Sequence, residues 1–557
     1  MNNNIISELK EYKNNAGRQV IGFFDYSQNN DKGKLIIIPP AFGETKRDAL
    51  KIAYFLVKNG FNVLRYDATD HVGESTGDMI DASLEKLKND LITSIDFSQD
   101  ILGAKEVGIV TNSLGVRVSI KAATQDKRIK FLIGLVGIID VRSSFKAVYH
   151  QDTIGEILNG KYRGKNVDDV MGFEVSIDFV HSAIKYQYQD LETTKSDLGK
   201  MNIPIVLIYA DNDPWVNLED AKKILDIVPS EDKEFYLIPN AMHQLNENPQ
   251  AVQMALVQIV VSTKKYMDKK IISPQEIIMP GKDELSHQWL IEEERLRNLL
   301  KKSLEGEKEF WEKYLNKFVL IHKSFDYRDF LATITDFLEI HPGDKVLDAG
   351  CGNGHFGAWL FEKMIETVFK DKMDLKNFAP IQYTGLDFVE NSLKEAMLKH
   401  LNITKRVYRE LSLRDKYQIV KYKYILSDME KPLPFPDNCF DKICCNLVIS
   451  YVKDPQYSVN ELIRVLKKGG RMVISSMKPY ADLSQIYRNF VDKTESQEEL
   501  EEARKLLSAA GRIKQKENAG FYRFFSTEEL IGLTSEIKNK KLARTFANQA
   551  NVVTLQK

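Results

Sequence analysis

The feature that most constrains the fold is that short apolar strands alternate with helical patterns twice along the chain. The first series has strand patterns at Leu35–Pro39, Asn62–Tyr66, Val107–Val110, Phe131–Ile139, Ile205–Tyr209 and Glu234–Ile238. The second has them at Lys345–Asp348, Tyr383–Asp387, Tyr424–Ser427, Asp441–Asn446 and Arg471–Ser476. Alternation of this kind is typical of a mostly parallel sheet with helices on both faces. We therefore predict an α/β protein of two domains, each built on its own sheet.

A charged stretch between the two series marks the boundary. Residues 264–302 are rich in charge and contain Pro274 and Pro280-Gly281 as helix breakers. We assign them to a linker and a leading helix, the helical pattern running from Asp283 to about Phe318. The predicted domains are then residues 1–263 and 303–557, which agrees with the length to which single α/β domains extend.

Composition excludes several classes of protein. Lys and Arg total 78 and Asp and Glu total 79, so the chain lacks the basic excess of a dedicated nucleic-acid binder. The apolar runs fall short of the ~18 residues that a membrane span needs. The four cysteines form no CxxC pair, so neither a disulfide framework nor a metal site is predicted. With no signal-peptide pattern near Met1, we expect a cytoplasmic enzyme.

The first domain contains a pattern typical of a nucleophilic serine. In Thr111-Asn-Ser113-Leu-Gly115 an apolar strand turns directly into a helix, as in the nucleophile elbow of serine hydrolases. Gly115 meets the need for a small residue after the serine, whereas Thr111 departs from the small residue expected before it. A serine at this place is also a common helix cap, so Ser113 needs partners to indicate catalysis.

Two such partners follow later strands. Asp213 comes after Ile205–Tyr209, and His243 comes after Glu234–Ile238. The order Ser, Asp, His is that of α/β-hydrolases, in which the histidine takes the serine proton and the acid orients the histidine. Asp211 is an alternative acid, although Val216, three residues beyond Asp213, favours Asp213.

An oxyanion formed at this serine needs backbone N–H donors. One is expected from Leu114, the residue after the nucleophile. The other is expected from the loop Pro40–Gly43 after the first strong strand, which makes Ala41 and Phe42 the candidates.

Two segments of this half resemble a known family. They are Arg65–Gly77 (RYDATDHVGESTG) and Ala210–Val216 (ADNDPWV), and they are similar to the acyltransferases of bacterial luminescence over about residues 5–261. The resemblance implies an α/β-hydrolase fold and a thioesterase or acyltransferase that takes a fatty acyl group from acyl carrier protein onto Ser113. Residues 141–200 would form the cap that shapes the acyl pocket.

The second domain opens with a glycine-rich loop. Asp348-Ala-Gly350-Cys-Gly352-Asn-Gly354 joins a strand to a helix, and its glycines allow a ligand to approach the backbone. Asp348 can bind an ammonium group. Asp387 ends the next strand, where an acidic residue binds ribose hydroxyls in nucleotide-binding folds.

Later strands complete the pattern. Asp428 and Met429 follow the third strand, where the carboxylate suits an adenine amine, and Asn446 and Leu447 follow the fourth. From about Trp311 to Lys557 the order is similar to class I S-adenosylmethionine-dependent methyltransferases, which have a Rossmann-like fold. The resemblance implies S-adenosylmethionine as cofactor, with its methionine part on Asp348 and Gly350, Gly352 and Gly354, its ribose on Asp387 and its adenine beside Asp428 and Met429. Asn446 and Leu447 would border the sulfonium and the methyl acceptor.

Three functions fit these motifs. In the first, Ser113 accepts an acyl group from a thioester and the second domain methylates a small-molecule product; without a compelling general base, a carboxylate or an enol is favoured as acceptor. In the second, a carboxyl methyltransferase is paired with a methyl-ester esterase, as in biotin synthesis. In the third, the hydrolase-like half only binds acyl groups and has no catalytic role.

Overall fold

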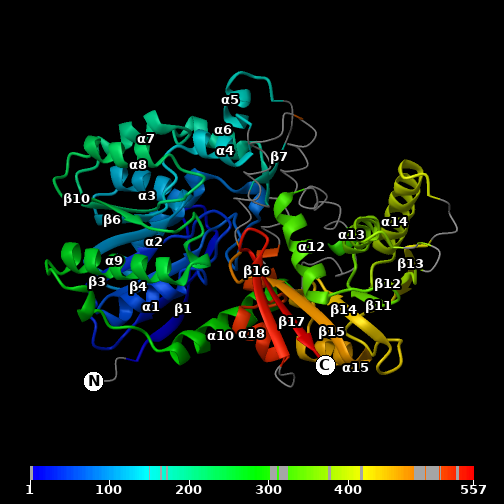
Figure 1. Ribbon diagram of the computed structural model, residues 1–557. Coiled ribbons are helices and arrows are strands. Elements are labelled where there is room, and N and C mark those ends of the chain that lie inside the picture. Colours follow the sequence, from blue (N-terminus) through cyan, green and yellow to red (C-terminus); the bar gives the residue numbers. More distant parts are fainter. Residues whose placement is uncertain are drawn as a thin grey trace. The chain divides into compact units, whose positions relative to one another are not determined.

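The computed structural model describes residues 4–149, 151–162, 166–170, 173–300, 310–312, 324–373, 375, 378–413, 418–481, 496, 513–514, 516–534 and 539–557. The described residues form two compact units, the first up to residue 300 and the second from residue 310 onward. Each unit contains its own sheet with helices packed against it (Figure 1). The two-domain α/β architecture expected from the sequence is confirmed.

The first sheet has eight strands in the order β1-β2-β4-β3-β5-β6-β9-β10. Their bounds are β1 Ile6–Lys13, β2 Gln19–Tyr26, β3 Lys34–Ile38, β4 Asn62–Asp67, β5 Glu106–Asn112, β6 Ile129–Leu135, β9 Ile205–Ala210 and β10 Lys233–Ile238. Strand β2 pairs antiparallel with both of its neighbours, and the remaining pairs are parallel. The carboxyl ends of β5, β9 and β10 therefore meet at one edge of the sheet.

Helices cover this sheet. They are α1 Leu50–Lys58, α2 Leu84–Asp100, α3 Leu114–Gln125, α8 Leu218–Lys223, α9 Pro249–Met267 and α10 Lys282–Leu300, with 3₁₀ turns at Met79–Asp81, Ile224–Ile227, Leu245–Glu247 and Pro274–Glu276. Apolar side chains of α1 and α9 pack with those of β3, β6 and β9 in one core. Between β6 and β9 the chain forms α4 Val141–Tyr149, α5 Thr153–Leu158, β7 Asn166–Val170, β8 Phe173–Ser176, α6 Asp178–Lys185 and α7 Leu191–Leu198.

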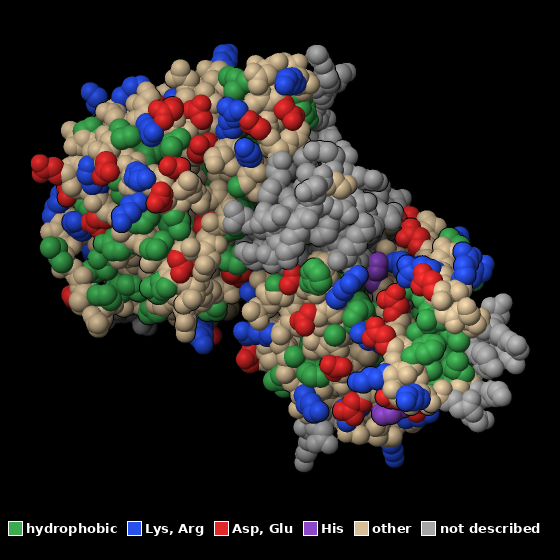
Figure 2. Space-filling model, turned by 45° about the horizontal axis from the view of Figure 1, so that its top comes forward, with side chains coloured by type: hydrophobic (Ala, Val, Ile, Leu, Met, Phe, Trp, Pro, Cys, Tyr) green, Lys and Arg blue, Asp and Glu red, His purple; other side chains and the backbone are tan. Residues whose placement is uncertain are grey.

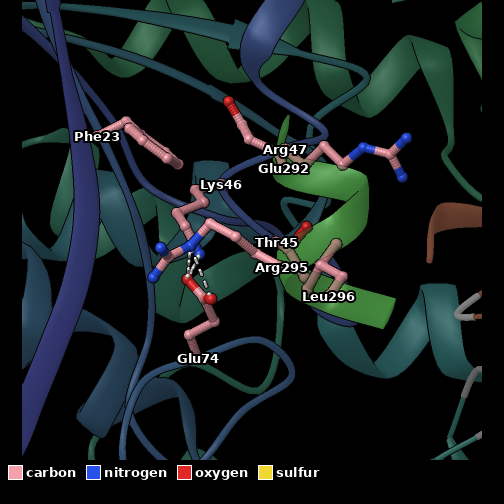
Figure 3. Close-up of a pocket in the computed structure, with 8 residues that line it drawn as sticks. All are labelled: Phe23, Thr45, Lys46, Arg47, Glu74, Glu292, Arg295 and Leu296. Carbon is pink, nitrogen blue, oxygen red and sulfur yellow. Dashed lines mark hydrogen bonds and ion pairs between the residues drawn. The ribbon is translucent and has the colours of Figure 1, made fainter. Parts of the chain in front are cut away.

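Helix α10 is bound to the first unit by a buried ion network. Arg65 is fully buried, and its guanidinium lies 2.6 Å from Asp25 and 2.7 Å from Glu292 of α10. Lys46 and Arg295 converge on the carboxylate of Glu74 at 2.9 and 3.0 Å (Figure 3). The gap that these side chains line is too narrow to admit a water molecule, so they form a packed contact and not a ligand pocket.

This packing differs from the linker and leading helix that the sequence assigns to residues 264–302. Helix α9 runs to Met267, and α10 belongs to the first unit. The difference arises because the charges of α10, which a sequence pattern assigns to solvent, are the partners of buried charges. The sequence predicts that this helix continues to about Phe318. Beyond Leu300, residues 310–312 of that stretch are described, and its other residues lie outside the described part of the chain.

The second sheet has seven strands in the order β13-β12-β11-β14-β15-β17-β16. Their bounds are β11 Lys345–Ala349, β12 Ile381–Asp387, β13 Val420–Leu426, β14 Phe440–Cys445, β15 Leu466–Met477, β16 Asn539–Thr545 and β17 Ala550–Gln556. Strand β17 pairs antiparallel with β15 and β16, and the other pairs are parallel. The helices are α12 Phe325–Leu338, α13 His355–Lys370, α14 Glu390–Glu410, α15 Pro455–Val465 and α18 Thr527–Leu533, with a 3₁₀ turn at Ile449–Tyr451.

A separate core lies on each face of this sheet. Val346 and Cys444 belong to one cluster, whereas their neighbours Leu347 and Cys445 belong to the other. Successive side chains of a strand point to opposite faces, so the two clusters are the two faces of the sheet. Both cysteines are fully buried packing residues.

Among the described residues, no helix combines the length and apolarity that crossing a membrane requires. On the face drawn in Figure 2, basic and acidic side chains are interspersed.

Candidate active sites

Ser113 lies in a strained turn between β5 and α3. Its backbone has φ 49° and ψ −127°, which is uncommon for any residue other than glycine. The turn is held from both sides, since the Ser113 N–H donates to the carbonyl of Leu135 at 2.9 Å and the Ser113 carbonyl accepts from the N–H of Ile138 at 3.0 Å. This is the geometry of a nucleophile elbow, which presents a serine hydroxyl at the end of a strand.

Thr111 departs from the expected elbow pattern. Its side chain fits in the turn because Gly115 has no side chain. A Cβ placed on Gly115 would lie 2.4 Å from the Thr111 hydroxyl oxygen. Thr111 is buried, so its side chain occupies the space that a second small residue would leave. The elbow therefore accommodates the threonine as long as position 115 stays glycine.

The structure brings Ser113, His243 and Asp213 together. The Ser113 Oγ lies 2.9 Å from the His243 Nε2, and the His243 Nδ1 lies 2.8 Å from the Asp213 Oδ2. The side chains of His243 and Asp213 are almost completely buried. The Trp215 ring stacks on the imidazole at 4.1 Å, and the backbone N–H of Trp215 donates to the other oxygen of Asp213. Two hydrogen bonds in this order can activate a serine for acyl transfer.

Asp211, the alternative acid, lies elsewhere. Its carboxylate accepts hydrogen bonds from the backbone N–H groups of Asn240 and Ala241 at 3.0 and 3.1 Å. These residues begin the loop that ends at His243. Asp211 thus supports the loop and does not contact the imidazole in the structure.

The loop with Ala41 and Phe42 lies beside the elbow. The carbonyl of Pro40 is 3.6 Å from a Cβ placed on Gly115, and the Asn112 side-chain amide donates to the Glu44 carboxylate at 3.0 Å. Leu114 is the first residue of α3, directly after Ser113. The three N–H groups expected to bind an oxyanion therefore belong to two neighbouring segments.

Aromatic side chains lie next to this loop. The Phe42 ring makes edge contacts with Phe173 of β8 and Phe179 of α6, at centroid distances of 6.0 and 5.5 Å. Both belong to the stretch 141–200 that the sequence assigns to a cap. The side of Phe42 that faces β8 and α6 is thus apolar, as an acyl chain would require.

In the second unit, the glycine loop has the backbone that its sequence predicts. Gly350, Gly352 and Gly354 have φ values of 75°, 50° and 80°, which strongly favour glycine. A Cβ on Gly350 would lie 2.6 Å from Val448, and one on Gly354 would lie 2.7 Å from Ala396. The loop thus depends on bare backbone at the end of β11.

Two carboxylates lie at this end of the sheet, and one of them, Asp387, holds the loop. Asp348 is buried, its carboxylate accepts from the Tyr383 hydroxyl at 2.7 Å, and burial raises its pKa to about 6. Asp387 accepts from the N–H groups of Gly352 and Val389, both at 2.9 Å, and burial raises its pKa. Each Asp387 oxygen retains a second lone pair with which to accept from a ligand hydroxyl.

The polar side chains after β13 and β14 differ in whether they have hydrogen-bond partners. Asp428 accepts from the N–H of Glu430 at 2.9 Å, and Met429 is buried. The side-chain amide of Asn446 has its oxygen and nitrogen buried, and neither finds a hydrogen-bond partner among the described residues. Leu447 has φ 59°, a strained value for leucine. An unsatisfied buried amide beside a strained residue is typical of a site that a ligand completes.

His400 is a functional candidate that the sequence does not reveal. It lies in α14, and its Nε2 donates to the carbonyl of Gly354 at 2.7 Å while its Nδ1 is 2.7 Å from the Tyr424 hydroxyl. Burial lowers the pKa of His400 to about 4, which keeps the ring neutral in this arrangement. A histidine in the middle of a polar helix carries no pattern from which this contact could be predicted.

Comparison with known proteins supports the family resemblance predicted for each half of the chain. The family model described as acyl transferase matches residues 6–302, and the model described as methyltransferase domain matches residues 340–525. The chain is 26% identical to an acyl transferase of Photobacterium leiognathi over 50% of this chain and 87% of that protein. It is 27% identical to an acyl transferase of Aliivibrio fischeri over 54% of this chain and 96% of that protein.

A solved structure, Est1E from Butyrivibrio proteoclasticus with bound ferulic acid, is 18% identical and covers 47% of this chain and 98% of its own, with a TM-score of 0.38. The resemblances read from the sequence are confirmed by the two family models. Because the first model spans more than half of the chain, the protein belongs to the acyl transferase family and carries a methyltransferase domain in its second half.

Proposed function

We propose that the protein is a bifunctional enzyme that transfers an acyl group through Ser113 and methylates a small molecule in its second domain. The observation that carries the first part is the hydrogen-bonded series Ser113, His243 and Asp213 at a strained elbow, in a chain of the acyl transferase family. The methyltransferase domain carries the second part.

The acyl step follows from the geometry. His243 takes the proton as the Ser113 Oγ attacks the acyl carbonyl, and the N–H groups of Leu114 and of Ala41 or Phe42 stabilise the oxyanion. The bond to the leaving group then breaks, and His243 returns the proton to it. For a thioester donor, such as an acyl carrier protein conjugate, the leaving group is a thiol and the product is an acyl-serine. Water or another nucleophile releases the acyl group by the same steps.

The second site fits S-adenosylmethionine as methyl donor. The unsatisfied amide of Asn446 and the bare backbone of the glycine loop support this choice, because both are left for a ligand to contact. Asp348 and the loop glycines would hold the methionine part, Asp387 the ribose hydroxyls, and Asp428 and Met429 the adenine. Asn446 and Leu447 would border the acceptor. The bound donor supplies an electrophilic methyl group, and these residues position the acceptor for in-line attack.

The acyl step predicts a covalent adduct on Ser113. Incubation of the full chain with a long-chain p-nitrophenyl ester or acyl thioester, followed by acid quench, is expected to increase the intact mass by one acyl group. Peptide mass spectrometry should place the adduct on Ser113. Ser113→Ala should acquire none, because the hydroxyl that contacts His243 is then absent. An equal adduct on Ser113→Ala, or a wild-type protein that never forms one, would contradict the serine mechanism.

The methyl-donor site predicts a selective loss of binding. Asp387→Ala is expected to raise the Kd for S-adenosylmethionine by about 100-fold or more, because two charged hydrogen bonds to the ribose, each contributing about 1.5–3 kcal/mol, would be lost. Titration calorimetry measures this directly. Asp437→Ala is a matched control, since its carboxylate is two-thirds exposed outside the site. An Asp387→Ala protein that binds the donor as tightly as the wild type would refute the assignment.

A further inference from the structure

His71 contacts the candidate oxyanion loop from outside the Ser–His–Asp series. It lies in the loop that follows β4, and its Nε2 accepts a hydrogen bond from the backbone N–H of Gly43 at 3.0 Å. The ring is nearly completely buried and meets the edge of the Phe42 ring at a centroid distance of 5.8 Å. His71 thus touches both residues at the end of the loop that lies beside the elbow.

The acceptor role requires a neutral ring. A backbone N–H can only donate, so the Nε2 of His71 must carry a lone pair and the proton must be on the Nδ1. Burial lowers the pKa of His71 to about 4, in agreement with a neutral imidazole.

Gly43 lies in a turn that the Glu44 N–H closes on the Ala41 carbonyl at 3.0 Å, and His71 adds a contact from outside this turn. Its φ is 77°, and a Cβ at this position would lie 2.6 Å from the Phe173 ring, so glycine is required. Glycine also leaves the peptide on either side free to rotate. The peptide group is planar, so fixing the Gly43 N–H also fixes the direction of the Phe42 carbonyl. The His71 hydrogen bond thus adds to the Ala41–Glu44 turn in fixing the orientation of the peptide between Phe42 and Gly43.

Two further contacts anchor the same segment. The N–H of Lys46 donates to Asp67 at 2.7 Å, and Asn112, the residue before Ser113, donates to the Glu44 side chain. Asp67 also accepts from the N–H of Glu74 at 2.8 Å, which ties the loop of His71 to the same carboxylate. Positions 43, 44 and 46 are thus held, and they in turn limit the directions that the preceding N–H groups of Ala41 and Phe42 can take.

We propose that His71 is a positioning residue for acyl transfer, which orients the Ala41 and Phe42 N–H groups by holding the Gly43 amide. The inference rests on the proposed serine mechanism. It separates His71 from the proton-transferring His243, because His71 acts through the loop and exchanges no proton with the substrate.

The test compares two substitutions. His71→Phe keeps an aromatic ring but removes the acceptor, whereas the side-chain oxygen of His71→Gln reaches about as far as the Nε2 and can accept. For the acylation of Ser113 by a p-nitrophenyl ester, His71→Phe is expected to lower kcat/KM by about 10- to 100-fold, since small misplacements of catalytic groups have effects of this size. His71→Gln should recover most of the rate. His341→Phe, at an exposed histidine of the second unit, is the matched control.

An oxyanion-forming ligand separates positioning from general damage. The affinity of an alkyl trifluoromethyl ketone, which forms a hemiketal oxyanion on the serine, should fall in parallel with kcat/KM in His71→Phe. The affinity for the free fatty acid should change by less than about threefold by the same reasoning. Equal losses in His71→Phe and His71→Gln, or a fatty-acid affinity that falls as much as the ketone affinity, would overturn the proposal.

Hydrogen exchange distinguishes this proposal from the serine mechanism itself. Peptides covering Pro40–Arg47 should exchange faster in His71→Phe than in the wild type and regain protection in His71→Gln, whether or not Ser113 reacts. If the wild type forms no Ser113 adduct but the three proteins differ in exchange as described, only the serine mechanism is refuted. Unchanged exchange in His71→Phe refutes the positioning role.

Discussion

Replacing Asp213 with asparagine is expected to lower kcat for acyl transfer by about 10⁴-fold, the size of loss that results when the acid orienting a catalytic histidine is neutralised. The Asp213 Oδ2 lies 2.8 Å from the His243 Nδ1, and the other oxygen accepts a hydrogen bond from the backbone N–H of Trp215. An amide at this place can donate its NH₂ to the Nδ1, so the imidazole carries its proton on the Nε2 and cannot accept the proton of Ser113. Steady-state hydrolysis of a p-nitrophenyl ester measures the loss.

Asp211→Asn is the matched control, two residues away in the same turn. Its oxygens accept backbone N–H groups that an asparagine oxygen can still accept in part, so we expect a rate within about threefold of the wild type. If Asp211→Asn lost as much activity as Asp213→Asn, or Asp213→Asn retained its rate, the acid would be wrongly assigned.

Glu292→Ala is expected to destabilise the first unit by about 3–5 kcal/mol, because the buried guanidinium of Arg65 loses its two charged hydrogen bonds to Glu292. Arg65 is fully buried, and its guanidinium forms ion pairs with Glu292 of α10 and Asp25 of β2. The free energy of opening follows from hydrogen exchange of peptides from β2 and β4, measured on the full chain. This readout reports on the first unit without requiring that the two units unfold together.

The same helix supplies the control for this prediction. Glu294→Ala changes an exposed position of α10 and should alter the opening free energy by less than about 0.5 kcal/mol. Equal, small effects of the two substitutions would show that α10 does not stabilise the unit. A large effect of Glu292→Ala alone would support placing α10 in the acyl transferase unit.

The parallel strands of the two large sheets could be predicted from the sequence, and the antiparallel strands β1, β2, β16 and β17 could not. Strands such as β3 and β9 are buried on both faces and appear as continuous apolar runs. Strands β1 and β16 form sheet edges, and charged residues interrupt both segments. Such patterns are hard to distinguish from exposed loops or helices, because an edge strand is only partly buried.

The candidate site could be predicted only where its functional residues follow the end of a strand. Ser113, Asp213 and His243 each come directly after a strand of the parallel sheet, so topology alone places them at one edge. His71 and His400 contact their loops through tertiary packing. No spacing in the sequence encodes which backbone group a buried histidine will meet.

Helix α10 shows a second reason why the sequence alone did not predict all of the structure. A run of glutamate and arginine residues on a helix normally indicates a solvent-exposed face. Here Glu292 is buried because Arg65, far away in the sequence, needs a partner. Assigning the charges of α10 correctly required knowing which buried charges they meet.

We propose that acyl transfer through Ser113 supplies the small molecule that the second domain methylates. The most direct test supplies methyl-labelled S-adenosylmethionine with a panel of acyl carrier protein thioesters and follows the label into extracted small molecules by mass spectrometry. The account predicts labelled product with wild type only when an acyl donor is present, and none with Ser113→Ala. Equal labelling by Ser113→Ala would contradict it and favour a methyltransferase that acts before, or independently of, the hydrolase.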